Sequence, residues 1–233
     1  MALDRASPPA ARPGGAVAPD LFRIAAAQAP VTIAASAAAP SRSGVSWPAI
    51  PLLALLTFWT ERLMAAPSRG CFLDLVNLAF HEAGHLFLTP FGSTLHYLGG
   101  TLGQLAVPAL LAGYFLFAGQ GRPMGSAVCA WWFGENLVNI SVYMADARDL
   151  ALPLVGGGDH DWNELFYRFG LLGQDSVRMV STGTRGLGSL VMLLGLAWLA
   201  CFALPASVRD GMAEALEGSA PFLARVIRGR SDG

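Results

Sequence analysis

The sequence predicts an all-α protein, a polytopic bundle of about five transmembrane helices. Only 13% of its 233 residues are charged and 54% are hydrophobic, whereas a soluble domain carries about 25% charged residues. The apolar residues form continuous runs of about 20 residues, the length that a helix needs to cross the hydrocarbon core of a bilayer. These runs do not alternate with polar residues, as the strands of a membrane barrel would.

The chain divides into three expected parts. Residues 1–46 are rich in Ala, Pro and Ser, a composition typical of a disordered tail. Residues 47–206 form the expected membrane domain. Residues 207–233 form an expected surface segment at the C-terminus.

Five apolar runs within the membrane domain predict its helices. Their approximate bounds are 47–65, 71–89, 98–117, 124–144 and 188–204. A polar connection at about 145–187 separates the last two runs. Within it, the amphipathic pattern over 164–179 favours a helix that lies at the membrane surface. Membrane lipid is therefore an expected partner of the chain.

Charge and composition narrow the possible partners and location. The formal net charge is −1, so the chain lacks the broad basic surface of a nucleic-acid-binding protein, and we expect no nucleic acid as a partner. All 15 basic residues are Arg, and Ala, Gly and Pro are abundant. This composition is typical of a GC-rich bacterial genome, and we expect an integral protein of the bacterial inner (plasma) membrane.

The second apolar run contains the motif His81-Glu82-Ala83-Gly84-His85. On a helix, two His at positions i and i+4 lie on one face and can bind one Zn²⁺. Glu82 can then accept a proton from a water molecule as a catalytic base. Ionisable side chains at membrane depth are costly, so this cluster indicates a functional site. The alternative is a buried His/Glu cluster that only joins helices by hydrogen bonds.

A catalytic zinc site needs a third protein ligand, and three residues compete for that place. Asp146 is the first candidate, because it ends a polar stripe that runs through Asn136 and Asn139. His160 and Asp161 are the alternatives, since a run of Gly before them permits a close approach of the backbone. The stripe has a structural alternative, because Asn and Asp also join membrane helices by hydrogen bonds.

Other polar and small residues have expected supporting roles. Asn77 lies one turn before His81, where its side chain could orient the imidazole. Gly99, Gly100, Gly103 and Gln104 predict close packing of the third helix. His96 is expected to be an interface residue and not a ligand.

These residues resemble the site-2 protease class of intramembrane zinc metallopeptidases. The resemblance rests on HEAGH at 81–85 and on ENLVNI at 135–140 followed by Asp146, and it covers about residues 73–146. Ala147 stands where the family has Gly, and no Pro lies between the Asn residues and Asp146. The resemblance implies that His81, His85 and Asp146 are the zinc ligands and that Glu82 is the general base.

The expected function is therefore a membrane-embedded zinc metallopeptidase. Its substrate would be a membrane protein or peptide, cleaved in a membrane-spanning or membrane-adjacent segment. Asn136 or Asn139 would donate a hydrogen bond to the developing oxyanion. The alternatives are a non-proteolytic metal-binding membrane protein, such as a lipid hydrolase or transporter, and a structural membrane protein without metal.

Overall fold

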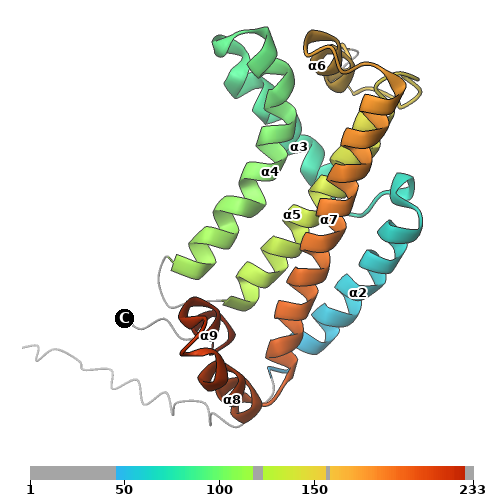
Figure 1. Cartoon of the computed structure of the whole chain (residues 1–233). Coiled ribbons are helices and arrows are strands. Elements are labelled where there is room, and N and C mark those ends of the chain that lie inside the picture. The colour runs from blue at the N-terminus through green and yellow to red at the C-terminus, as the bar shows by residue number, and fades with distance from the viewer. Residues whose placement is uncertain (1–45, 118–122, 156–157, 229–233) are drawn as a thin grey trace, which may run out of the picture. The chain divides into compact units, whose positions relative to one another are not determined.

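A computed structural model describes residues 46–117, 123–155 and 158–228. The expected disordered tail at 1–46 lies outside these described residues except for Ser46. Every described element is helical, which confirms the all-α class (Figure 1). The helices are α2 (Ala49–Ala65), α3 (Asp74–Leu88), α4 (Ser93–Phe117), α5 (Pro123–Ala145), α6 (Asp161–Arg168), α7 (Gln174–Ala203), α8 (Ala206–Leu216) and α9 (Pro221–Arg228), with 3₁₀ turns at Pro67–Arg69 and Thr89–Phe91.

Two pairs of long helices form the frame of the protein. Helix α5 runs alongside α7 and α3 runs alongside α4, while α4 also packs on α5 and α2 packs on α7 (Figure 1). The main apolar core lies among α2, α5 and α7, and it includes Leu56, Leu63, Trp131, Val138, Met192 and Leu199.

Helices α3 and α4 lie backbone to backbone where glycines face each other. A Cβ atom added at Gly84 would overlap the carbonyl group of Gly99, and one added at Gly103 would overlap the carbonyl oxygen of Phe80. Small residues allow membrane helices to approach this closely. The close packing that the glycines predicted is confirmed.

Polar side chains join α3 to α5. Asn77 Nδ2 donates to Glu135 Oε2 at 2.9 Å, and Trp132 Nε1 donates to Asn77 Oδ1 at 2.7 Å. Both the nitrogen and the oxygen of the Asn77 side-chain amide thus form hydrogen bonds with α5. The amide does not orient His81, the role that we expected for it. Such interhelical hydrogen bonds are the structural role that polar residues commonly have in membrane bundles.

Within the described residues, α4 and α7 are the two helices long and apolar enough to cross a membrane. Helices α2 and α3 have 17 and 15 residues, fewer than the ~20 that a perpendicular span needs. Helix α5 has 23 residues but contains Glu135 and Asn136 in its buried face. The helices that meet the length and hydropathy of a span are thus fewer than the five runs predicted.

The helix expected within the polar connection at about 145–187 has different bounds in the structure. In place of one helix over 164–179, α6 ends at Arg168 and α7 begins at Gln174. Gly170 turns the chain between them with φ +68°, a backbone conformation that favours Gly. Helix α7 therefore starts well before residue 188, where the fifth run begins.

The contact between α3 and α4 can be tested with Gly99→Ala. We expect this variant to lower the midpoint of thermal unfolding in detergent, because the added methyl group would press on the backbone of Gly84. Such overpacking costs about 1–3 kcal/mol. Gly113→Ala is the matched control in the same helix, because a Cβ atom there meets open space. Equal midpoints for the two variants would contradict the close contact.

Candidate metal centre

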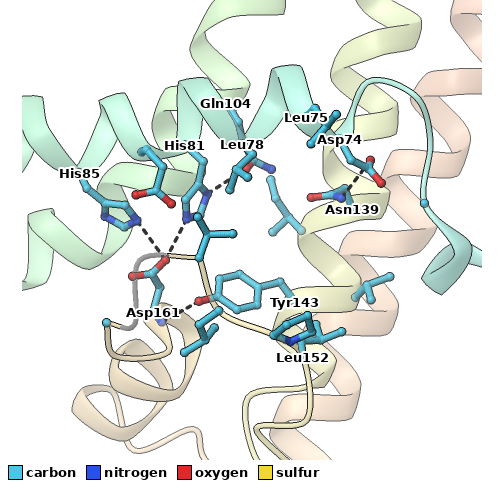
Figure 2. A pocket seen from close by; sticks show the side chains of 18 of the residues that line it. Asp74, Leu75, Leu78, His81, His85, Gln104, Asn139, Tyr143, Leu152 and Asp161 are labelled. Atoms are coloured by element: carbon cyan, nitrogen blue, oxygen red, sulfur yellow. Dashed lines mark hydrogen bonds and ion pairs between the residues drawn. The ribbon is translucent and has the colours of Figure 1, made fainter.

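Three side chains from two helices converge on one point (Figure 2). His81 and His85 come from one face of α3, and Asp161 is the first residue of α6. Asp161 Oδ2 lies 3.0 Å from His81 Nε2 and 3.2 Å from His85 Nε2. One ligand atom from each residue lies within 4.8 Å of the others. This group could therefore hold a single metal ion.

Both imidazoles are held through their Nδ1 atoms. His81 Nδ1 lies 2.9 Å from Gln104 Oε1, and His85 Nδ1 lies 2.7 Å from the carbonyl oxygen of His96. A carbonyl oxygen only accepts hydrogen bonds, so His85 Nδ1 carries a hydrogen, and the amide oxygen of Gln104 assigns the same tautomer to His81. In the neutral form of each ring, Nε2 is then an unprotonated acceptor.

When both rings are neutral, the carboxylate of Asp161 therefore faces two nitrogen lone pairs. Three acceptor atoms at these distances repel one another unless a proton or a metal cation lies among them. Metal-binding His side chains show this arrangement, with the other ring nitrogen donating to a carbonyl or carboxylate oxygen. The donor set of His81, His85 and Asp161 thus fits a metal ion.

The ionisation of Asp161 suits this role. Burial alone would raise the pKa of its carboxyl group, but hydrogen bonds and positive charge from the protonated imidazoles of His81 and His85 outweigh that effect and hold the pKa below its usual range. The side chain is therefore a carboxylate at neutral pH, which is the form that coordinates metals.

A glycine on α4 makes room for one of the ligands. A Cβ atom at Gly100 would overlap the imidazole of His81. Gln104, which holds the same ring, lies one turn further along α4 and is 3% exposed. The face of α4 that contacts α3 thus both admits and orients His81.

Asp146, our first candidate for the third ligand, does not belong to this group. Its carboxylate accepts the backbone N–H groups of Ala151 and Leu152, each at 3.0 Å. Leu150, the residue before Ala151, has φ +51°. This backbone conformation costs a residue with a side chain about 1–2 kcal/mol. Asp146 therefore holds the turn that follows α5 through these hydrogen bonds. It is not among the residues that converge with the two His.

His160, an alternative third ligand, caps α6 instead. Its Nδ1 accepts the N–H of Asn163 at 3.1 Å, and its Nε2 lies 3.4 Å from Asp146 Oδ2. Burial lowers the pKa of His160, and the nearby charge of Asp146 opposes this only in part. The ring is thus a neutral cap, and Asp161 is the alternative that the structure brings to the two His.

Helix α6 is fixed to its neighbours from outside the group. Arg168 Nη1 donates to Ser93 Oγ of α4 at 2.8 Å, and Asn163 Nδ2 donates to the carbonyl oxygen of Ala147 at 2.7 Å. These bonds place the N-terminus of α6, and with it Asp161, against α3.

A pocket of about 720 Å³ opens beside the three side chains (Figure 2). Glu82, the expected base, directly follows His81 in the sequence. Its side chain is exposed and lines this pocket. The pocket walls are otherwise a mixture of apolar and polar groups, with contributions from Leu75, Leu78, Gln104, Ile140, Tyr143 and residues 152–155.

The two Asn residues expected to bind an oxyanion lie in different places. Asn139 lines the pocket, but its Nδ2 donates to Asp74 Oδ1 at 3.3 Å. Asn136 is fully buried, its Nδ2 donates to the carbonyl oxygen of Trp132 at 3.1 Å, and it is absent from the pocket lining. Asn136 is therefore part of the helix packing, and Asn139 is at the far side of the pocket from α6.

Sequence reasoning missed two groups that orient the ligands. Gln104 was assigned only to helix packing, and His96 contributes its backbone carbonyl, which no side-chain pattern reveals. A signal for Gln104 exists, since it lies four residues after Gly100 and therefore on the same face of α4. That face was already predicted to be the packing face.

Comparison with known proteins adds no assignment. No protein family, curated protein or solved structure matches this chain.

The identity of the third ligand can be tested with single Ala variants. We expect Asp161→Ala to lose its bound metal, because it removes one of three converging ligands. Asp146→Ala keeps all three ligands and should weaken metal binding by about 10–100-fold, as is typical for groups that support a ligand. Elemental analysis and competition with a chelator measure both effects. Full metal retention by Asp161→Ala, with loss by Asp146→Ala, would reverse the assignment.

Proposed function

We propose that the chain is a membrane-embedded zinc metallopeptidase that cleaves a membrane-spanning or membrane-adjacent peptide. The observation that carries the proposal is the convergence of His81, His85 and Asp161 beside the pocket that Glu82 lines. Two His and one carboxylate with an open position form a ligand set of hydrolytic zinc sites. The same ligand types also bind non-haem iron, but a Glu directly after the first His favours zinc hydrolysis.

The residues of the site divide the chemistry among them. Zinc, when bound, lowers the pKa of a water molecule toward ~7 and polarises the scissile carbonyl group. Glu82 accepts the proton of the attacking water and returns it to the leaving amine. Gln104 and the carbonyl of His96 keep the two imidazoles in the tautomer that binds metal.

The surroundings of α4 and α7 support a membrane location. Only 22% and 28% of their most apolar windows are buried, whereas the core helix of a soluble protein is mostly buried. Large apolar side chains such as Leu110, Phe117 and Leu194 are exposed on them. Lipid would cover such surfaces. We propose that α2, α3 and α5 complete a bundle of about five spans in a bacterial inner membrane.

The position of the site along α3 suits a peptidase that needs water. At 1.5 Å per residue, α3 is only ~22 Å long, less than the ~30 Å thickness of a bilayer core. His81 is the central residue of α3, and His85 lies one turn nearer its C-terminal end. The metal centre would therefore lie toward one face of the membrane, where water and a peptide segment can both reach the pocket.

Zinc content is the first test of the proposal. We expect about one zinc ion per chain in the purified protein by elemental analysis, because the three ligands form one site. The double variant His81→Ala/His85→Ala should lose it. Full zinc retention by this variant would disprove the site, and stoichiometric iron in the wild-type protein would indicate a different chemistry.

The role of Glu82 is tested by Glu82→Gln. We expect this variant to bind zinc normally and to lose cleavage by about 10²–10⁴-fold, the usual contribution of a general base. A library of membrane-segment peptides in detergent, read by mass spectrometry, measures cleavage. Glu61→Gln, on the exposed side of α2, is the matched control and should cleave normally.

Two results would oppose the peptidase assignment. Cleavage by Glu82→Gln at the wild-type rate would show that Glu82 is not the base. A wild-type protein that binds zinc and cleaves no peptide would favour the non-proteolytic alternative, a metal-binding lipid hydrolase or transporter.

A further inference from the structure

Tyr143 of α5 points into the pocket toward Asp161 (Figure 2). Its hydroxyl oxygen accepts the backbone N–H of Asp161 at 3.1 Å, and the hydroxyl also interacts with the carboxylate of the same residue. The hydroxyl group thus lies beside the third member of the metal-binding group, on the side of the pocket formed by α6.

The ring of Tyr143 is fixed by its neighbours. It packs against His160 with ring centroids 4.1 Å apart and meets His81 nearly edge-on at 6.1 Å. One neighbour caps α6 and the other belongs to the metal-binding group. A hydroxyl on a ring held in this way has little freedom to turn from its position, which is the condition under which a hydrogen-bond donor stabilises developing charge.

The phenolic proton of Tyr143 has two possible acceptors, the carboxylate of Asp161 and an oxygen atom in the pocket. A phenol offers one donor and accepts through its oxygen lone pairs. The phenolic oxygen already accepts the N–H of Asp161. The phenolic proton is donated either to the Asp161 carboxylate or to an oxygen atom in the pocket. Once the carboxylate binds a cation, it becomes the poorer acceptor of the two.

We propose that Tyr143 is a further catalytic residue, whose hydroxyl donates a hydrogen bond to the oxygen atom at the open position beside His81, His85 and Asp161. The inference rests on the proposed function and fills the role that the sequence suggested for Asn136 or Asn139. In peptide hydrolysis this oxygen is that of the scissile carbonyl, on which negative charge develops.

The test compares an oxygen ligand with a sulfur ligand in the full-length protein loaded with Co²⁺. Acetohydroxamate and 2-mercaptoethanol both bind an open metal position, and the visible spectrum of Co²⁺ reports their dissociation constants. We expect Tyr143→Phe to bind acetohydroxamate at least about tenfold more weakly, the effect of losing a hydrogen bond to a charged group. Binding of 2-mercaptoethanol should not change, because sulfur is a weak acceptor.

A matched control isolates the position of the hydroxyl. Tyr167→Phe makes the same chemical change on α6, at a side chain that is 72% exposed, and it should leave both dissociation constants unchanged. Tyr143→Phe with an unchanged hydroxamate constant overturns the proposal. An equal loss of affinity for both ligands also overturns it, because that result indicates a role in packing alone.

If the Tyr143→Phe variant fails to fold or to bind cobalt, a second measurement on wild-type protein replaces it. Wild-type protein labelled with 3-fluorotyrosine keeps every ring and hydroxyl, but its phenols are more acidic and therefore stronger donors. It should bind acetohydroxamate more tightly than unlabelled protein and bind 2-mercaptoethanol equally, and an unchanged hydroxamate constant overturns the proposal. Unlabelled wild-type protein that binds no cobalt would instead disprove the metal site itself.

Discussion

The contact between the backbones of α3 and α4 is the constraint on which the candidate metal centre depends. Because Gly84 and Gly99 have no side chains, the two helices approach until each of these glycines lies against the carbonyl group of the other. At that separation Gln104 and the carbonyl of His96 can both reach imidazoles on α3. A wider gap would leave both rings free to rotate, and their Nε2 atoms would no longer point to one place. Helix packing thus orients the two imidazoles of the candidate metal-binding group.

Asp161, the third residue of the candidate metal-binding group, is placed by a separate set of bonds. Asp161 begins a short helix, and eight residues of α6 would not hold a stable position in isolation. The helix is instead capped by His160 and bonded to the start of α4 and to the turn after α5 through Arg168 and Asn163. Asp146 holds the turn that leads toward it. These four polar residues of the connection therefore have structural roles, and they support the carboxylate of Asp161 that faces α3.

The sequence predicted correctly those features that depend on residues close together in the chain. Hydrophobic runs identified the helical class, and the spacing of His81 and His85 placed both on one helix face. The residue that joins His81 and His85 could not be predicted in the same way, because its position depends on how the turn after α5 folds. Asp146 continued a helical stripe, but the chain leaves α5 at Ala145 and the carboxylate turns to backbone N–H groups. Asn77 was misassigned because its partners, Glu135 and Trp132, lie on another helix.

The separation of the ligands along the chain has a consequence for how the protein is made. Asp161 follows His85 by 76 residues (161 − 85), and both α4 and α5 lie between them. A cation bound by all three residues would close this long loop and restrict the unfolded chain as a cross-link does. The nascent protein could not complete the site until α4 and α5 had been synthesised and α6 had docked. Metal uptake would thus mark the end of assembly, and early fragments would carry only an incomplete pair of His ligands.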